Sequence, residues 1–217
     1  MKRAILHVGT QIMRVRESKA LSIERTAELV IIAGCSGAGK SAIGKVLAKE
    51  RGYAFVDADT LSGGYTNWIT KEIAGAEGNR EIKLYKQELQ PIEEITALRV
   101  CKDILTAGQS VVLAIPFTSL IANYHKWIAL KATVGLSDEI PVQFIWIKHD
   151  SVIERARLEQ RGEPRDKYKL ASWKPFTNAM TTPDEQYDAV IVINNNHRGI
   201  SETAEEILDT IWPEQEA

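Results

Sequence analysis

A glycine-rich octapeptide, set between an apolar run and a helical pattern, constrains the fold of this chain more than any other feature. Residues Gly34 to Ser41 read GCSGAGKS, and the β-branched residues Val30 to Ile32 precede them. From Lys40 to Arg51 apolar residues recur at helical spacing, and Gly52 follows as a stop signal. This order predicts a buried strand, a tight loop and a helix, which together form one unit of an α/β fold.

Further apolar runs alternate with further helical patterns along the rest of the chain. The runs are nearly continuous in their apolar residues, which is typical of strands that helices bury on both faces. We therefore predict a three-layer α/β sandwich with right-handed crossovers. The predicted strands are residues 29–33, 54–56, 111–115, 142–147 and 189–193, and the predicted helices are residues 40–51, 91–107, 119–131, 151–161 and 201–211.

The octapeptide, called the phosphate loop below, matches the pattern G-x-x-x-x-G-K-[ST] at every defined position. Glycines let successive backbone N–H groups surround phosphate oxygens, and the helix that follows adds the positive end of its dipole. In this pattern Lys40 reaches the β- and γ-phosphates, and the Ser41 hydroxyl ligates Mg²⁺. The sequence thus predicts nucleotide contacts from Gly34, Ser36, Gly37, Ala38, Gly39, Lys40, Ser41 and Ala42.

Two carboxylates follow the second apolar run. Asp57 and Asp59 are spaced i and i+2, so on a strand they would point the same way, at the edge where α/β folds bind ligands. Asp57 would act at the Mg²⁺ ion, and Asp59 would accept a proton from an acceptor hydroxyl. The alternative is a solvated turn in which Asp59 caps a helix. The third run ends in Pro116-Phe117-Thr118 and not in an acidic residue, which argues against GTPases and motor ATPases and favours a kinase.

A basic segment follows the fourth run. Arg157 and Arg161 lie one turn apart on a predicted helix, a glycine and a proline end that helix, and Arg165 comes next. Guanidinium groups on a mobile segment can close over a nucleotide and stabilise charge in phosphoryl transfer. The alternative is a solvated, salt-bridged helix end. We predict a lid over residues 157–175, with Arg161 and Arg165 catalytic and Arg157 on the nucleotide.

Polar residues also follow the last run. Asn194 and Asn195 could hold the base of the nucleotide, or they could form a turn that caps the next helix. Residues 61–90 lack periodicity and are rich in glycine and charge, so we expect them to form an insertion on the acceptor side. The aromatic and polar candidates there and after the third run are Tyr65, Trp68, Lys83, Tyr85, Lys86, Phe117, Thr118 and Asn123.

The composition fits one domain with an appendage. Residues 28–217 would form the domain, and residues 1–27 would form an N-terminal appendage with a possible hairpin. The 27 Lys+Arg and 29 Asp+Glu residues give a net charge of −2, which is weak evidence against a protein that coats nucleic acid. The two cysteines have no metal-ligand spacing, and no window approaches the roughly 20 apolar residues of a membrane span. We expect an intracellular protein that contacts no membrane and lies in the cytoplasm (of the host, if a phage encodes it).

The phosphate loop, the Asp57-Ala58-Asp59 segment and the arginine-rich lid resemble the small P-loop kinases. That group includes gluconate, shikimate, zeta-toxin-like and polynucleotide 5′-hydroxyl kinases. Residues 111–118 and 161–170, followed by Trp173, resemble more closely the bacterial and phage ATP-binding proteins with an Arg-Gly-x-Pro-Arg-Asp lid. Some phage members of that set phosphorylate hydroxymethylated pyrimidines in DNA. The resemblance covers roughly residues 28–212.

This resemblance implies a five-stranded parallel sheet of order 2-3-1-4-5, with ATP bound across the phosphate loop. It implies Lys40 and Ser41 at phosphate and metal, Asp57 near the metal, Asp59 at the acceptor hydroxyl, and Arg161 and Arg165 over the phosphates. The arginine set with which shikimate kinases bind a sugar acid is not recognisable, and residues 61–90 match no known segment.

The predicted function is that of an ATP-dependent kinase, with Mg²⁺ and ATP as cofactors. Its acceptor would be a hydroxyl on a small polar metabolite, which the net charge favours, or on a hydroxymethylated pyrimidine in DNA, which the basic N-terminus and lid leave open. The alternative is a nucleotide-dependent regulatory ATPase or binding module without a phosphoacceptor. The sequence predicts no particular oligomeric state.

Overall fold

The fold is seen in a computed structural model that describes residues 26–173, 183–184, 186–187, 190–196 and 198–213. The hairpin predicted before residue 16 lies outside the described residues. No helix in the described part of the chain is long and apolar enough to cross a membrane.

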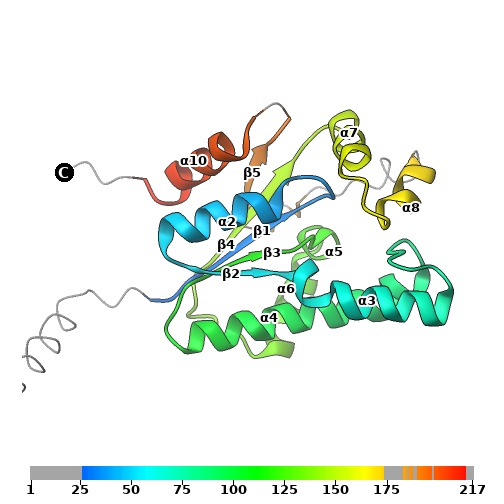
Figure 1. The fold of residues 1–217 in the computed structure, drawn as a ribbon. Coiled ribbons are helices and arrows are strands. Elements are labelled where there is room, and N and C mark those ends of the chain that lie inside the picture. Colours follow the sequence, from blue (N-terminus) through cyan, green and yellow to red (C-terminus); the bar gives the residue numbers. More distant parts are fainter. Residues whose placement is uncertain (1–25, 174–182, 185, 188–189, 197, 214–217) are drawn as a thin grey trace, which may run out of the picture.

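Five parallel strands form one sheet in the order β2-β3-β1-β4-β5 (Figure 1). This confirms the predicted three-layer α/β fold and its strand order. The central strand β1 is buried along its whole length, as its β-branched run predicted. The strands are β1 Leu29–Gly34, β2 Ala54–Asp57, β3 Val111–Ala114, β4 Val142–Lys148 and β5 Val190–Asn194.

Helices cover both faces of the sheet, and β1 shows why (Figure 1). Its alternate residues Val30 and Ile32 pack toward α2 Lys40–Arg51 and α10 Ile200–Ile211, whereas Leu29 and Ile31 pack toward α4 Gln90–Thr106 and α6 Tyr124–Val134. The two cores bring the carboxyl ends of β1 and β3 to one edge of the sheet. The phosphate loop begins at that edge.

Residues 61–90 are mostly helical, although their sequence lacks periodicity, and their role as an insertion on the acceptor side stays a prediction. Helix α3 spans Ala58–Ala74, and a π-helix, η1 Tyr85–Leu89, leads directly into α4. The buried side of α3 carries Ser62, Thr66 and Thr70 in place of apolar residues. Ser62 and Thr70 donate their hydroxyls to backbone carbonyls four residues earlier, each at 2.8 Å. Because the buried stripe is polar, the helix leaves no hydrophobic periodicity in the sequence.

The prediction of a single helix over residues 119–131 is wrong, because a short helix, α5 Thr118–Ile121, ends before a second helix begins at Tyr124. Asn123 has extended backbone, and its side chain accepts a hydrogen bond from Lys126 N at 3.2 Å. An asparagine in this position starts a new helix, α6.

Candidate active site

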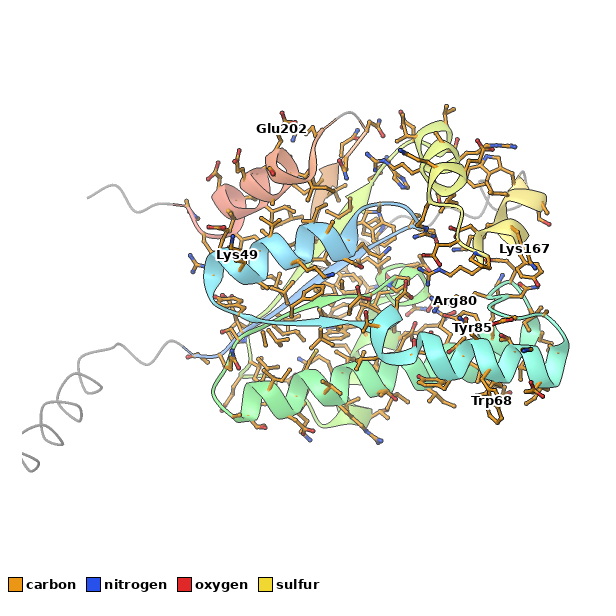
Figure 2. All side chains as sticks on the ribbon, in the orientation of Figure 1. Lys49, Trp68, Arg80, Tyr85, Lys167 and Glu202 are labelled. Carbon is orange, nitrogen blue, oxygen red and sulfur yellow. The ribbon has the colours of Figure 1, made fainter. Side chains whose placement is uncertain are left out.

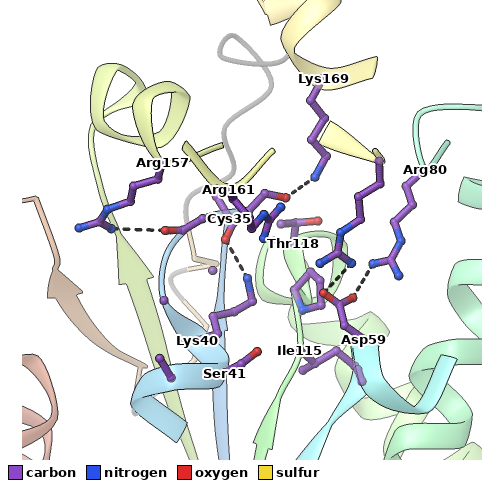
Figure 3. A pocket seen from close by; sticks show the side chains of 18 of the residues that line it. Cys35, Lys40, Ser41, Asp59, Arg80, Ile115, Thr118, Arg157, Arg161 and Lys169 are labelled. Carbon is purple, nitrogen blue, oxygen red and sulfur yellow. Dashed lines mark hydrogen bonds and ion pairs between the residues drawn. The ribbon is translucent and has the colours of Figure 1, made fainter. Parts of the chain in front are cut away.

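A cleft of about 840 Å³ opens above the carboxyl ends of β1 and β3. Its walls come from the phosphate loop, from α3, η1 and α4, and from the lid helices α7 Ser151–Arg161 and α8 Asp166–Ala171. Figure 3 shows side chains from these three parts pointing into one space. This is the edge of a parallel sheet at which α/β folds bind ligands.

The phosphate loop needs glycine where it turns. Gly34 has φ 146°, and a Cβ there would lie 2.5 Å from Ile147 O on the neighbouring strand. Gly39 has φ 88° and leads into α2. Both positions therefore exclude other residues, the first by contact and the second by backbone strain.

Side chains from distant elements fix the peptide planes of the phosphate loop. Four successive carbonyls each accept a hydrogen bond, and three of the donors come from residues at least 113 positions away. Because a trans peptide points its N–H opposite its carbonyl, fixing the carbonyls also fixes the N–H groups that would meet phosphate. The contacts are Lys40 Nζ to Cys35 O at 2.8 Å, His149 Nε2 to Ser36 O at 3.2 Å, Arg157 Nη1 to Gly37 O at 3.4 Å, and Asn195 Nδ2 to Ala38 O at 3.0 Å.

The predicted phosphate and metal residues lie at the start of α2. Lys40 points into the cleft beside Ser41 (Figure 3), and burial lowers the pKa of Lys40 to about 8. Among the described residues, no cluster of three or more His, Cys, Asp or Glu side chains could hold a metal by itself. A Mg²⁺ ion fits the Ser41 hydroxyl, because Mg²⁺ in such sites takes most of its ligands from phosphates and water. Bound there, it would neutralise charge on the phosphates.

Asp57 and Asp59 do not continue one strand, so the prediction that they point the same way is wrong. The chain turns into α3 at Ala58, and Asp57 is the residue that caps this helix, by accepting from Asp59 N at 2.9 Å and Thr60 N at 3.4 Å. The alternative in which Asp59 is the cap is wrong as well. Asp59 lines the cleft, and Asp57 is not among the described residues that do. A role of Asp57 at the metal stays a prediction.

Two arginines hold Asp59 (Figure 3). Arg80 Nη1 lies 2.5 Å from Asp59 Oδ1, and Arg165 Nη1 lies 2.8 Å from Oδ2. Burial would raise the pKa of Asp59, but the two guanidinium groups outweigh burial and hold that pKa well below its usual range. In this state Asp59 is a weak base. Arg80 comes from residues 61–90 and was not predicted, because its contact spans 21 positions in a segment without periodicity.

The lid is a helix break, as predicted. Helix α7 ends at Gly162, which has φ 64°, and α8 begins at Asp166. Arg161 forms a salt bridge with the buried Asp166. Its Nε and Nη2 atoms lie 2.8 Å and 2.6 Å from the carboxylate oxygens of Asp166. The salt-bridged alternative therefore describes Arg161, although Arg161 also lines the cleft.

The two asparagines after β5 have different places. Asn195 is buried, donates to Ala38 O and accepts from Thr203 Oγ1 at 3.2 Å, so it joins the phosphate loop to α10. Asn194 is exposed and accepts from Asn196 N. Arg198, Gly199 and Ile200 line the cleft on this side. The base contacts of Asn194 and Asn195 stay predictions.

Some of the acceptor-side candidates line the cleft and others do not. Tyr85, Lys86 and Thr118 line the cleft. Trp68 points outward from α3 and is 64% exposed (Figure 2), whereas Phe117 is fully buried in the core.

Two neighbouring glutamates on α4, Glu93 and Glu94, line the cleft. Both oxygens of Glu93 accept hydroxyl hydrogen bonds, one from Thr66 and one from Tyr85 at 2.7 Å. Glu94 accepts one hydrogen bond, from Gln90 at 2.9 Å. Burial, together with the charge of Glu93, raises the pKa of Glu94 to about 7. The two carboxylates are buried to a similar extent, but Glu93 accepts two hydrogen bonds and Glu94 accepts one.

This contrast predicts opposite effects of the same substitution. Between about pH 4.5 and pH 7, Glu94 binds more protons in the folded chain than in the unfolded chain. The burial of its carboxylate therefore destabilises the fold increasingly as the pH rises, and this destabilisation is complete above pH 7. Glu94→Gln should raise the melting temperature by about 5 °C at pH 8, and less at pH 5. Glu93→Gln should lower it, because two hydroxyl donors lose a carboxylate. Thermal unfolding at both pH values tests the pair, and an equal gain for Glu94→Gln at pH 5 and pH 8 would contradict it.

Known proteins resemble this chain along most of its length. The shikimate kinase of Bacillus cytotoxicus is 26% identical over 183 residues, which cover 84% of this chain and 97% of that protein. That of Francisella tularensis subsp. holarctica is 36% identical over 114 residues, which cover 51% of this chain and 60% of that protein.

Solved structures show the same fold. A sugar kinase from Janibacter sp. HTCC2649 superposes with a TM-score of 0.60 at 21% identity, over 86% of this chain and 96% of that one. A gluconokinase from Sinorhizobium meliloti 1021 superposes with a TM-score of 0.56 at 18% identity, over 85% and 91%. The family model described as "AAA domain" matches residues 29–183. The chain therefore belongs to this AAA-domain family and, with its phosphate loop, sheet order and lid, to the small P-loop kinases.

Proposed function

We propose that the protein transfers the γ-phosphoryl group of Mg-ATP to a hydroxyl of a small hydroxy acid. The observation that carries the proposal is the convergence of Arg80 and Arg165 on Asp59 in the acceptor half of the cleft. The phosphate loop supports the nucleotide, and this arginine pair supports the acceptor.

The arginine pair has hydrogen-bonding capacity that Asp59 does not use. Within the described residues, the Nε groups of Arg80 and Arg165 are buried and have no hydrogen-bond partner. A buried guanidinium donor without an acceptor is costly. An anionic group on the acceptor would supply the missing oxygens and balance the second positive charge.

The pair also supports a role for Asp59 as the base. When an acceptor anion binds the two guanidinium groups, they stabilise the Asp59 carboxylate less. The pKa of Asp59 then rises, because Arg80 and Arg165 divide their interaction between Asp59 and the anion. The acceptor would thus create the base that deprotonates its hydroxyl. Lys40 would bind the β- and γ-phosphates beside the Ser41 hydroxyl.

The names of the relatives agree with an anionic acceptor. Shikimate and gluconate, which give the shikimate kinases and the gluconokinase their names, are both hydroxy acids. Arg80 and Arg165 would provide the acid-binding arginines that were not recognisable in the sequence. Hydroxymethylated DNA remains a test acceptor because the lid resembles that of phage base kinases.

A screen with γ-labelled ATP tests this proposal. It compares hydroxy acids with their neutral amides and alcohols, with nucleosides, and with hydroxymethyluracil-containing DNA. We expect label on a hydroxy acid, with kcat/KM about 100-fold lower for the neutral analogue that lacks the charge. Equal labelling of a neutral polyol or of DNA would overturn the hydroxy acid. Full ATP hydrolysis without any acceptor would instead support the regulatory ATPase.

A further inference from the structure

The three lid arginines that were predicted to act at the nucleotide and the phosphates each have protein partners in the described part of the chain. The partners are Gly37 O and Asn195 O for Arg157, Asp166 for Arg161, and Asp59 for Arg165. The lid also brings a further cation, Lys169, to the cleft.

Lys169, like Arg157, is a lid cation that contacts the phosphate loop. It lies on α8, and its Nζ donates a hydrogen bond to Ser36 Oγ across 133 positions of sequence (Figure 3). Its side chain enters the cleft from the lid, opposite Lys40 on α2 (Figure 3). Lys169 therefore joins the lid to the phosphate loop.

The ammonium groups of Lys40 and Lys169 converge on one volume. They are close enough that Lys169, after burial, contributes to lowering the pKa of Lys40. Two like charges held together in a cleft favour a shared anion between them. The phosphate chain of a nucleotide is such an anion, and the phosphate loop fixes where it lies.

We propose that Lys169 is the lid residue that contacts the transferring γ-phosphoryl group. The proposal rests on the kinase activity proposed above. In that reaction the acceptor oxygen bonds to the γ-phosphorus, and the bond from that phosphorus to the β–γ bridging oxygen breaks. Its electron pair leaves with ADP, and the hydroxyl proton passes to Asp59. Lys169 keeps its protons and donates a hydrogen bond to a γ-phosphoryl oxygen.

Nucleotide binding tests Lys169 without any acceptor. The measured quantity is the γ-phosphate preference, the Kd of MgADP divided by the Kd of Mg-β,γ-imido-ATP, from isothermal titration calorimetry. Lys169→Ala should lower this preference at least about 10-fold, because one charge-assisted hydrogen bond is lost, and Lys169→Arg should keep most of it. The matched control is Lys167→Ala, whose side chain lies on the same helix but is exposed over Tyr168.

An unchanged preference in Lys169→Ala would overturn this assignment. A loss of preference in Arg161→Ala/Asp166→Asn, a double variant that removes the buried charge along with the arginine, would then give the contact to Arg161. Since these measurements need no acceptor, they fail or succeed independently of the hydroxy-acid screen.

Discussion

Replacing Lys40 by methionine is expected to abolish phosphoryl transfer, by about 10³-fold or more, while leaving the fold intact. Lys40 donates to Cys35 O at 2.8 Å, so its hydrogen bond lies within the phosphate loop. Methionine has a similar length and removes a buried charge whose pKa burial already lowers. The loss should therefore appear in turnover and nucleotide affinity, and not in stability.

The measurement pairs label transfer with thermal unfolding of the same protein. Lys49→Met is the matched control, because Lys49 lies two and a half turns further along α2 with an exposed side chain (Figure 2). It should keep wild-type activity. Normal turnover in Lys40→Met would show that the phosphate loop does not hold the reacting phosphate.

The sheet and the phosphate loop were predictable because their signals are local. The central strands β1 and β3 are short apolar runs buried along their whole length, and Gly34 and Gly39 mark backbone geometry that other residues avoid. Strand order came from the resemblance, since parallel pairing joins segments that share no sequence signal. The break at Asn123 was missed because one capping side chain outweighed a continuous helical pattern.

The part of the cleft formed by α3 and the lid was harder to predict for a physical reason. Helix α3 turns Thr66 and Thr70 inward, so its buried face looks polar in the sequence. Arg80 and Lys169 act through contacts over 21 and 133 positions, and a charged residue far from its partner looks like any solvated charge. Arg161 was predicted to be catalytic, and its salt bridge to Asp166, five positions on, was not predicted; its catalytic role stays a prediction. Only the folded chain shows which of these charges meet.

The second large effect is expected at Asp59. Asp59→Asn should lower acceptor-dependent transfer by roughly 10²–10⁴-fold, the range for loss of a general base, while the Kd of Mg-ATP stays nearly unchanged. The amide cannot take the acceptor proton, and it leaves Arg80 and Arg165 without their carboxylate partner. Asp209→Asn, an exposed change on α10, is the control and should be silent.

The same variant separates the two functional classes. In a kinase the defect concerns transfer to the acceptor, and the arginine pair is freed to bind the acceptor anion more tightly. Asp59→Asn should therefore show a lower KM for a hydroxy acid together with its lower kcat, because that anion no longer competes with a resident carboxylate. Steady-state kinetics over a range of acceptor concentrations measures both. If ATP turnover needs no acceptor and Asp59→Asn leaves it intact, the site is a nucleotide switch, and the arginine pair serves only to hold the lid closed.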